Sequence, residues 1–174
     1  MDGNVVALLV AAVGMLGTLT SPVIGQRLTA RTKREEAEAT HERARREAVH
    51  GERKAAYIAF NAASRWYRVE MMNFLHAVDE AAVGDTERTE LRASRQAYQA
   101  ALAEIQILAT DEVLAAVGEI STRLTPAFHA LKRLEIGAPL PGWSFAETRD
   151  FLLGAWEHWL AMHRVMRSDL GLEG

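Results

Sequence analysis

The fold of this 174-residue chain is decided by residues 57–78, which read YIAFNAASRWYRVEMMNFLHAV. Large residues recur there in steps of three and four, which places them on one face of an α-helix. They are Tyr57, Phe60, Ser64, Tyr67, Met71, Phe74 and Val78. The alternation at every second residue that marks a β-strand is absent throughout the chain. The pattern predicts an amphipathic helix that ends near Ala82.

Two more amphipathic segments follow a turn expected at Gly84-Asp85. The first is predicted over residues 86–109. The second begins with Thr110 or Asp111 as its N-cap, because short polar side chains accept hydrogen bonds from the free N–H groups of a helix start. The residues expected on the inner sides are Leu91, Arg95, Tyr98, Leu102, Ile105, Leu108, Val113, Val117, Ile120 and Leu124.

Pro126 falls within the third segment. Proline lacks the N–H that an interior helical hydrogen bond needs, so we expect it to break or bend the helix. Thr125 and Pro126 then suit the N-cap and first position of a restarted helix. Its stripe continues as far as Gly137 through Phe128, Leu131 and Leu134.

The start of the last helix is predicted by two features. One is the loop GAPLPGW, residues 137–143, and the other is the segment Ser144-Phe145-Ala146-Glu147 that follows it. The serine and the glutamate form a capping box, in which each side chain accepts a hydrogen bond from the other residue's backbone N–H. The stripe of this helix is Phe151, Leu152, Ala155, Trp156, Trp159, Met162, Val165 and Met166. Four helical segments with short connections predict an all-α antiparallel bundle over residues 55–174.

No catalytic, cofactor or metal site is apparent. The chain has no cysteine, which excludes disulfides and thiolate chemistry. Glu47 and His50 match the Glu-x-x-His spacing of di-iron bundles, but the second such motif that those sites need is missing. His158 and His163 are five residues apart and point in different directions on a helix. We therefore expect a protein that is not an enzyme.

The C-terminal third is rich in aromatic residues, including Trp143, Trp156 and Trp159. Two interpretations remain open. The rings either fill the core of a small bundle or form a partner surface, where aromatic anchors are favoured. The cluster Arg65-Trp66-Tyr67-Arg68 is compatible with a polyanion. Residues 55–174, however, carry sixteen acidic and eleven basic side chains, so we expect no nucleic-acid partner.

A charged segment precedes the bundle. Residues 27–54 carry nine basic and six acidic side chains and almost no large apolar residue. Glu and Arg fall at helical spacing, as Glu42 and Arg46 do, and such pairs support a solvated helical stalk. Alanines at 30, 37 and 44 repeat every seven residues, the outline of a weak coiled-coil seam.

The N-terminus reads as a membrane anchor over residues 1–26. Twenty residues without charge, 5–24, span about 30 Å as a helix, the thickness of a bilayer core. A cleaved signal peptide is the alternative, but residues 1–4 lack its basic charge and no cleavage motif follows. The basic residues come afterwards, which predicts an outside N-terminus, a cytoplasmic body and contact with lipid headgroups through Arg27, Arg31, Lys33 and Arg34.

The second half of the anchor contains small residues at intervals of four, a spacing that lets two membrane helices approach closely. Self-association through this face is therefore a hypothesis. Pro22 favours a kink in the same half. The residues assigned to the anchor are Val5, Leu9, Val13, Gly14, Gly17, Ser21 and Pro22.

Residues 5–38, VVALLVAAVGMLGTLTSPVIGQRLTARTKREEAE, resemble the start of short single-pass membrane proteins of Streptomyces-type actinobacteria. Some of these are labelled KilB-like, after a membrane-associated protein of plasmid spread. The resemblance covers about the first fifty residues and the junction at residues 108–111, and it carries no catalytic motif. It implies an accessory role in plasmid transfer.

Three functions are consistent with these features. The first is a membrane-anchored interaction or scaffold protein that binds another protein or another copy of itself. The second is a membrane-tethered sensor with a small-ligand pocket between the helices. The third is the plasmid-transfer role that the resemblance implies.

Overall fold

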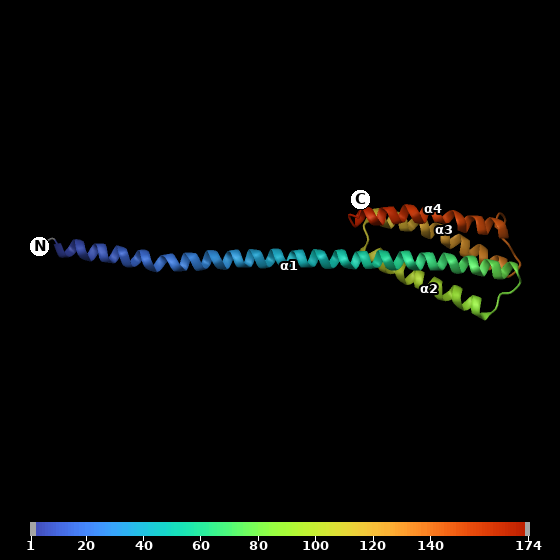
Figure 1. The fold of residues 1–174 in the computed structure, drawn as a ribbon, viewed down its shortest axis with the longest axis horizontal. Coiled ribbons are helices and arrows are strands. Elements are labelled where there is room, and N and C mark those ends of the chain that lie inside the picture. The colour runs from blue at the N-terminus through green and yellow to red at the C-terminus, as the bar shows by residue number, and fades with distance from the viewer. Residues whose placement is uncertain (1–2, 173–174) are drawn as a thin grey trace. The chain divides into compact units, whose positions relative to one another are not determined.

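A computed structural model of the chain describes the backbone of residues 3–172 and the side chains of residues 36–172. Within that part the protein is all-α and has no strand, as the sequence predicts (Figure 1). By backbone contacts it divides into two units, residues 1–48 and 49–174. The helices are α1 (Gly3–Asp79), α2 (Asp85–Leu108), α3 (Asp111–Glu135) and α4 (Phe145–Asp169).

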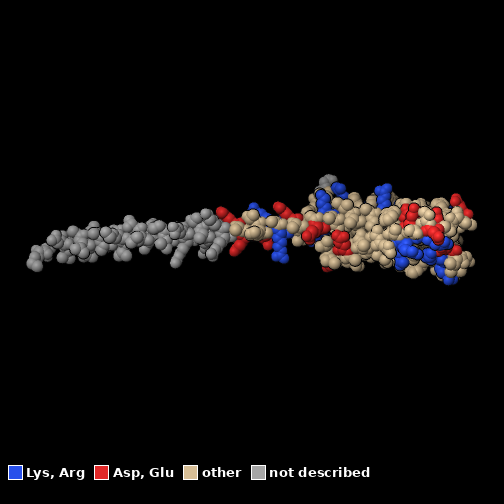
Figure 2. All heavy atoms as spheres, turned by 90° about the horizontal axis from the view of Figure 1, so that it is seen from below, with Lys and Arg blue, Asp and Glu red and all other residues tan. Residues whose placement is uncertain are grey.

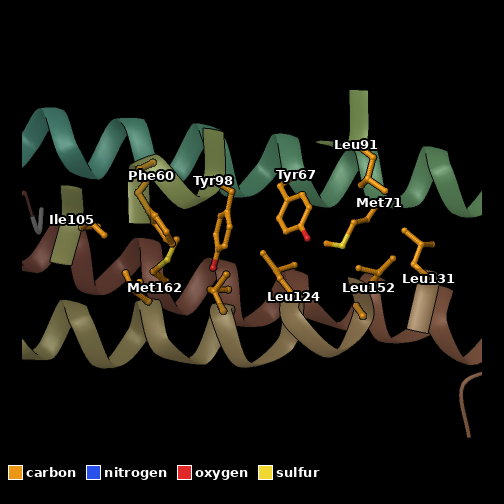
Figure 3. Close-up of a cluster of buried hydrophobic side chains, with 14 of the residues drawn as sticks. Phe60, Tyr67, Met71, Leu91, Tyr98, Ile105, Leu124, Leu131, Leu152 and Met162 are labelled. Atoms are coloured by element: carbon orange, nitrogen blue, oxygen red, sulfur yellow. The ribbon is translucent and has the colours of Figure 1, made fainter. Parts of the chain in front are cut away.

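The second unit is a four-helix bundle with one continuous core (Figure 3). The predicted stripe of α1 is buried from Tyr57 to Phe74, while Val78 is partly exposed. The closest backbone approach is between α3 and α4, where Ala127, Ala130 and Ala155 are buried. Side chains this small let two helix axes come near one another.

Three aromatic rings join α1 to α2 in the core. The ring of Tyr98 lies between those of Phe60 and Tyr67, at centroid distances of 5.7 Å and 5.2 Å. Figure 3 shows all three pointing into the space between the helices. Offset aromatic pairs of this kind contribute about 0.5–1.5 kcal/mol each beyond the burial of their area.

The turn after α1 lies earlier than the predicted position at Gly84-Asp85. The helix ends at Asp79, and Ala81 adopts a left-handed conformation with φ of 53°. The N–H of Ala82 donates to the carbonyl of Ala77 at 2.8 Å, which satisfies one of the last carbonyls of the helix. Gly84 is instead the N-cap of α2, and its N–H donates to the carboxylate of Glu87 at 2.8 Å.

The prediction that the third helix restarts at Thr125 is wrong, because α3 is one helix with Pro126 in its interior. Packing explains the difference. Leu124 and Ala127, on either side of the proline, are buried against the core. Burial of such side chains offsets the roughly 3 kcal/mol that an interior proline costs a helix. The N-cap of α3 is Thr110, one of the two predicted positions, but its side chain makes no cap hydrogen bond and its hydroxyl donates to Asp169 instead.

The capping box before α4 is confirmed. The N–H of Ser144 donates to Oε2 of Glu147 at 2.7 Å, and the N–H of Glu147 donates to Oγ of Ser144 at 3.3 Å. Hydrogen bonding to the side chain of Ser144, and secondarily to its backbone N–H, lowers the pKa of the Glu147 carboxyl. The box fixes where α4 begins and therefore which of its side chains turn toward α1.

A polar network closes the end of the bundle where α4 finishes. The hydroxyl of Tyr57 donates to Oδ2 of Asp169 at 2.8 Å, and Oγ1 of Thr110 donates to Oδ1 of the same carboxylate at 2.9 Å. Arg53 lies 3.5 Å from that carboxylate and donates to the carbonyl of Leu108 at 3.1 Å. One carboxylate thus holds α1, the α2–α3 junction and α4 together.

The described side chains of residues 36–50 are all exposed. The predicted helical pair forms there, with Nε of Arg46 lying 3.0 Å from Oε1 of Glu42. Among the described residues, no helix carries an apolar run sufficient to cross a bilayer. The predicted anchor, residues 1–26, and the four headgroup residues between 27 and 34 lie outside the residues whose side chains are described. The anchor and its pairing face therefore remain predictions.

Candidate interaction surface

Helices α1 and α4 pack side by side in opposite directions. Near one end of the bundle Tyr57 contacts Asp169. Further along α1, the guanidinium of Arg68 lies 5.9 Å from the ring centroid of Trp156, which comes earlier in α4. Increasing residue numbers on α1 therefore meet decreasing numbers on α4, and the two helices share a long junction.

Large apolar side chains remain exposed on both helices, and two of them, Ile58 and Trp156, line hollows at this junction. On α1 they are Ile58, Trp66 and Val69, and on α4 they are Leu153, Trp156 and Leu160. Each is 39% to 61% exposed. At 100° per residue, each set falls within about 80° of its helix circumference. The six residues, which we call the α1–α4 face, form two apolar stripes along neighbouring helices.

Two hollows mark the junction between the stripes. The larger, about 180 Å³, lies toward the C-terminus of α4, and the smaller, about 10 Å³, lies at Trp156. Oδ1 of Asn61 lines the larger hollow and is buried without a hydrogen-bond partner among the described residues. The side chains around the larger hollow are Lys54, Tyr57, Ile58, Asn61, His163, Met166, Arg167, Leu170 and Leu172.

The Lys and Arg side chains that line the two hollows are positively charged. Lys54 and Arg167 border the larger hollow, and Arg65 and Arg68 border the smaller one. Of the described residues that line either hollow, none is a carboxylate. Burial, and secondarily the charge of Arg65, lowers the pKa of Arg68. The charged side chains that line the two hollows are therefore basic, and apolar side chains lie among them.

Of the three tryptophans that the sequence grouped as a candidate partner surface, two stack on each other and the third, Trp143, packs elsewhere. Trp143 packs on Phe151, with ring centroids 4.9 Å apart, and contacts the core. Trp156 and Trp159 stack at 4.8 Å, and Trp159 stacks in turn on His163 at 5.4 Å. Of the three, Trp156 is the most exposed, at 41%.

The basic–aromatic cluster at residues 65–68 does not form one surface. Tyr67 is buried in the core, whereas Arg65 and Trp66 are exposed. Burial raises the pKa of Tyr67, and the nearby charge of Arg95 lowers it by less. As for metals, no three His, Asp or Glu side chains of the described residues gather closely enough to hold an ion.

Comparison of the chain with family models, with curated proteins and with solved structures finds no match. Sequence reasoning identified Trp156 but missed Ile58, Val69, Leu153 and Leu160. Their signal was present, because each is a large apolar residue about a quarter-turn or more away from the buried stripe of its helix.

Proposed function

We propose that this protein is a membrane-anchored interaction module whose α1–α4 face binds an amphipathic helix of a partner protein. The observation that carries the proposal is the pair of exposed apolar stripes on α1 and α4, from which Ile58 and Trp156 line the hollows of the α1–α4 junction. Solvated helices normally expose such residues singly, and a contiguous patch marks an interaction site. A groove between two helices suits a third helix that inserts apolar side chains at intervals of three and four.

The charge of the junction supports a partner with acidic flanks. Arg65, Arg68 and Arg167 border the apolar stripes, and the residues lining the hollows include no carboxylate. Acidic side chains beside the apolar face of the partner helix would meet these cations. A second copy of this chain is a poorer occupant, because a two-fold pairing of this face sets its own arginines against one another.

The predicted anchor would hold the protein at a membrane. The uncharged run of residues 5–24 and the basic residues that follow it support a single-pass helix with the bundle on the cytoplasmic side. Retention in membranes after carbonate extraction tests this part, and Leu9→Arg should reduce that retention because it places a charge within the apolar run. If carbonate released the wild type and Leu9→Arg into the soluble fraction to the same extent, the membrane anchor would be contradicted.

The interaction itself is tested with the full chain purified from gently solubilised native membranes. Leu160→Glu places a charge in the α1–α4 face, and Ile107→Glu places the same charge on α2, where the isoleucine is 82% exposed. We expect a partner that copurifies with the wild type and with Ile107→Glu and is lost from Leu160→Glu. The same set of copurifying proteins for all three chains would overturn the proposal.

A further inference from the structure

We propose that a second hollow, between α2 and α3, binds the dianionic phosphate of a phosphomonoester. This ligand site lies apart from the α1–α4 face and goes beyond the interaction function. Its volume is about 190 Å³, that of about six water molecules at liquid density. Its lining consists of Arg88, Leu91, Arg92, Arg95, Phe128 and Lys132.

The helix geometry gathers the cations. Arg88, Arg92 and Arg95 follow one another at intervals of four and three, so they share one face of α2. Lys132 approaches from α3. Figure 2 shows Lys and Arg gathered over one part of the bundle surface, with carboxylates beside them. Like charges this close repel one another, and a bound anion relieves that repulsion.

The carboxylates present neutralise only part of this charge. Glu135 pairs with Arg88 at 2.9 Å and also with Lys132, and Asp85 lies 3.5 Å from Arg88. Burial opposes ionisation of Glu135, but hydrogen bonds from Lys132 and Arg88 hold its pKa below the usual range. Four cations against two carboxylates leave two positive charges in excess, which matches a phosphomonoester of about −2 at neutral pH.

Two of these arginines are not held by any described carboxylate. Among the described residues, neither Arg92 nor Arg95 forms an ion pair with a carboxylate. The guanidinium of Arg95 lies 4.3 Å from the ring centroid of Phe128 and is held there by a cation–π contact. A guanidinium that is already oriented presents its N–H groups to a phosphate with little loss of entropy. Leu91 and Phe128 supply an apolar wall for the organic group of the ester.

The test uses phenyl phosphate, titrated into the purified full chain in a non-ionic detergent. We expect saturable binding that Arg92→Gln and Arg95→Gln each weaken by about ten-fold or more, the usual loss for one charge-assisted hydrogen bond. Arg149→Gln is the matched control, because Arg149 is an exposed arginine of α4 paired with its neighbour Asp150. It should bind phenyl phosphate as the wild type does.

Arg92 is exposed, so its replacement tests binding without disturbing the packing of Arg95 on Phe128. Absence of saturable binding, or equal affinities for the wild type and Arg92→Gln, would overturn the proposal.

The source of the phosphate is distinguished by adding phosphatidic acid to the micelles, with the phosphodiester phosphatidylglycerol as control. Competition by phosphatidic acid alone identifies a lipid headgroup, whereas binding of phenyl phosphate unaffected by either lipid identifies a soluble ester.

Discussion

The hydroxyl of Tyr57 donates a 2.8 Å hydrogen bond to Oδ2 of Asp169, which joins the first helix of the bundle to the end of the last. Thr110 and Arg53 approach the same carboxylate from the α2–α3 junction and from the preceding turn of α1. The side chain of Asp169 is only 14% exposed. A carboxylate this buried is stable when ionised only if donors surround it, so the network fixes the alignment of α1 and α4.

Tyr57→Phe should lower the free energy of unfolding by about 1.5–3 kcal/mol, the contribution of a hydrogen bond to a charged group. Urea unfolding of the full chain, followed by far-ultraviolet circular dichroism, measures it. The same substitution should cost much less in a chain that also carries Asp169→Ala, because the acceptor is then absent. Equal losses in the two backgrounds would show that Tyr57 acts through packing alone.

The three tyrosines of the chain should resist ionisation. Burial, and then the hydrogen bond to Asp169, raises the pKa of Tyr57 to about 12, and burial raises the pKa of Tyr67 and Tyr98. Because the folded pKa lies above the unfolded value of about 10, this stability is present below pH 10 and is lost as the pH rises toward 12. Absorbance of tyrosinate at pH 10 should be small and should increase on adding denaturant. Half-ionised tyrosines in a chain that is still fully helical would contradict the burial of these rings.

Ala81→Gly should stabilise the bundle by about 0.5–1 kcal/mol. Ala81 has a φ of 53°, a conformation that its Cβ disfavours and that glycine adopts without strain. Ala82→Gly is the control, because the φ of Ala82 is not positive and glycine there only adds freedom to the unfolded chain. Thermal unfolding should move in opposite directions for the two variants. A loss of stability in both would exclude strain at Ala81.

The helices could be predicted because their signals are local. The stripe from Tyr57 to Phe74 and the capping box at Ser144 depend only on spacing along the chain, and both are confirmed. The errors arose where tertiary packing outweighs local preference. Pro126 is retained inside α3 because its neighbours are buried. The left-handed residue of the turn after α1 is Ala81, although a glycine lies three residues beyond it.

The candidate surface could be predicted only in part. Trp156 was identified from its residue type, because large aromatic rings are favoured at partner surfaces. Its neighbours on the face, Val69 and Leu160, are unremarkable aliphatic residues. Their significance depends on the packing of α1 against α4, a contact between segments about ninety residues apart that one sequence does not reveal. The cation-lined hollow between α2 and α3 depends in the same way on which helices are neighbours.

The most direct test of the central claim compares photocrosslinking from two positions of the full chain in its native membranes. A photoreactive residue replaces Leu160 in the α1–α4 face or Ile107 on α2. We expect a discrete adduct from position 160, little or none from position 107, and a weaker adduct when Arg65→Glu reverses a charge beside the face. Equal adducts from the two positions, or none from position 160, would contradict the assignment of this face as the binding surface.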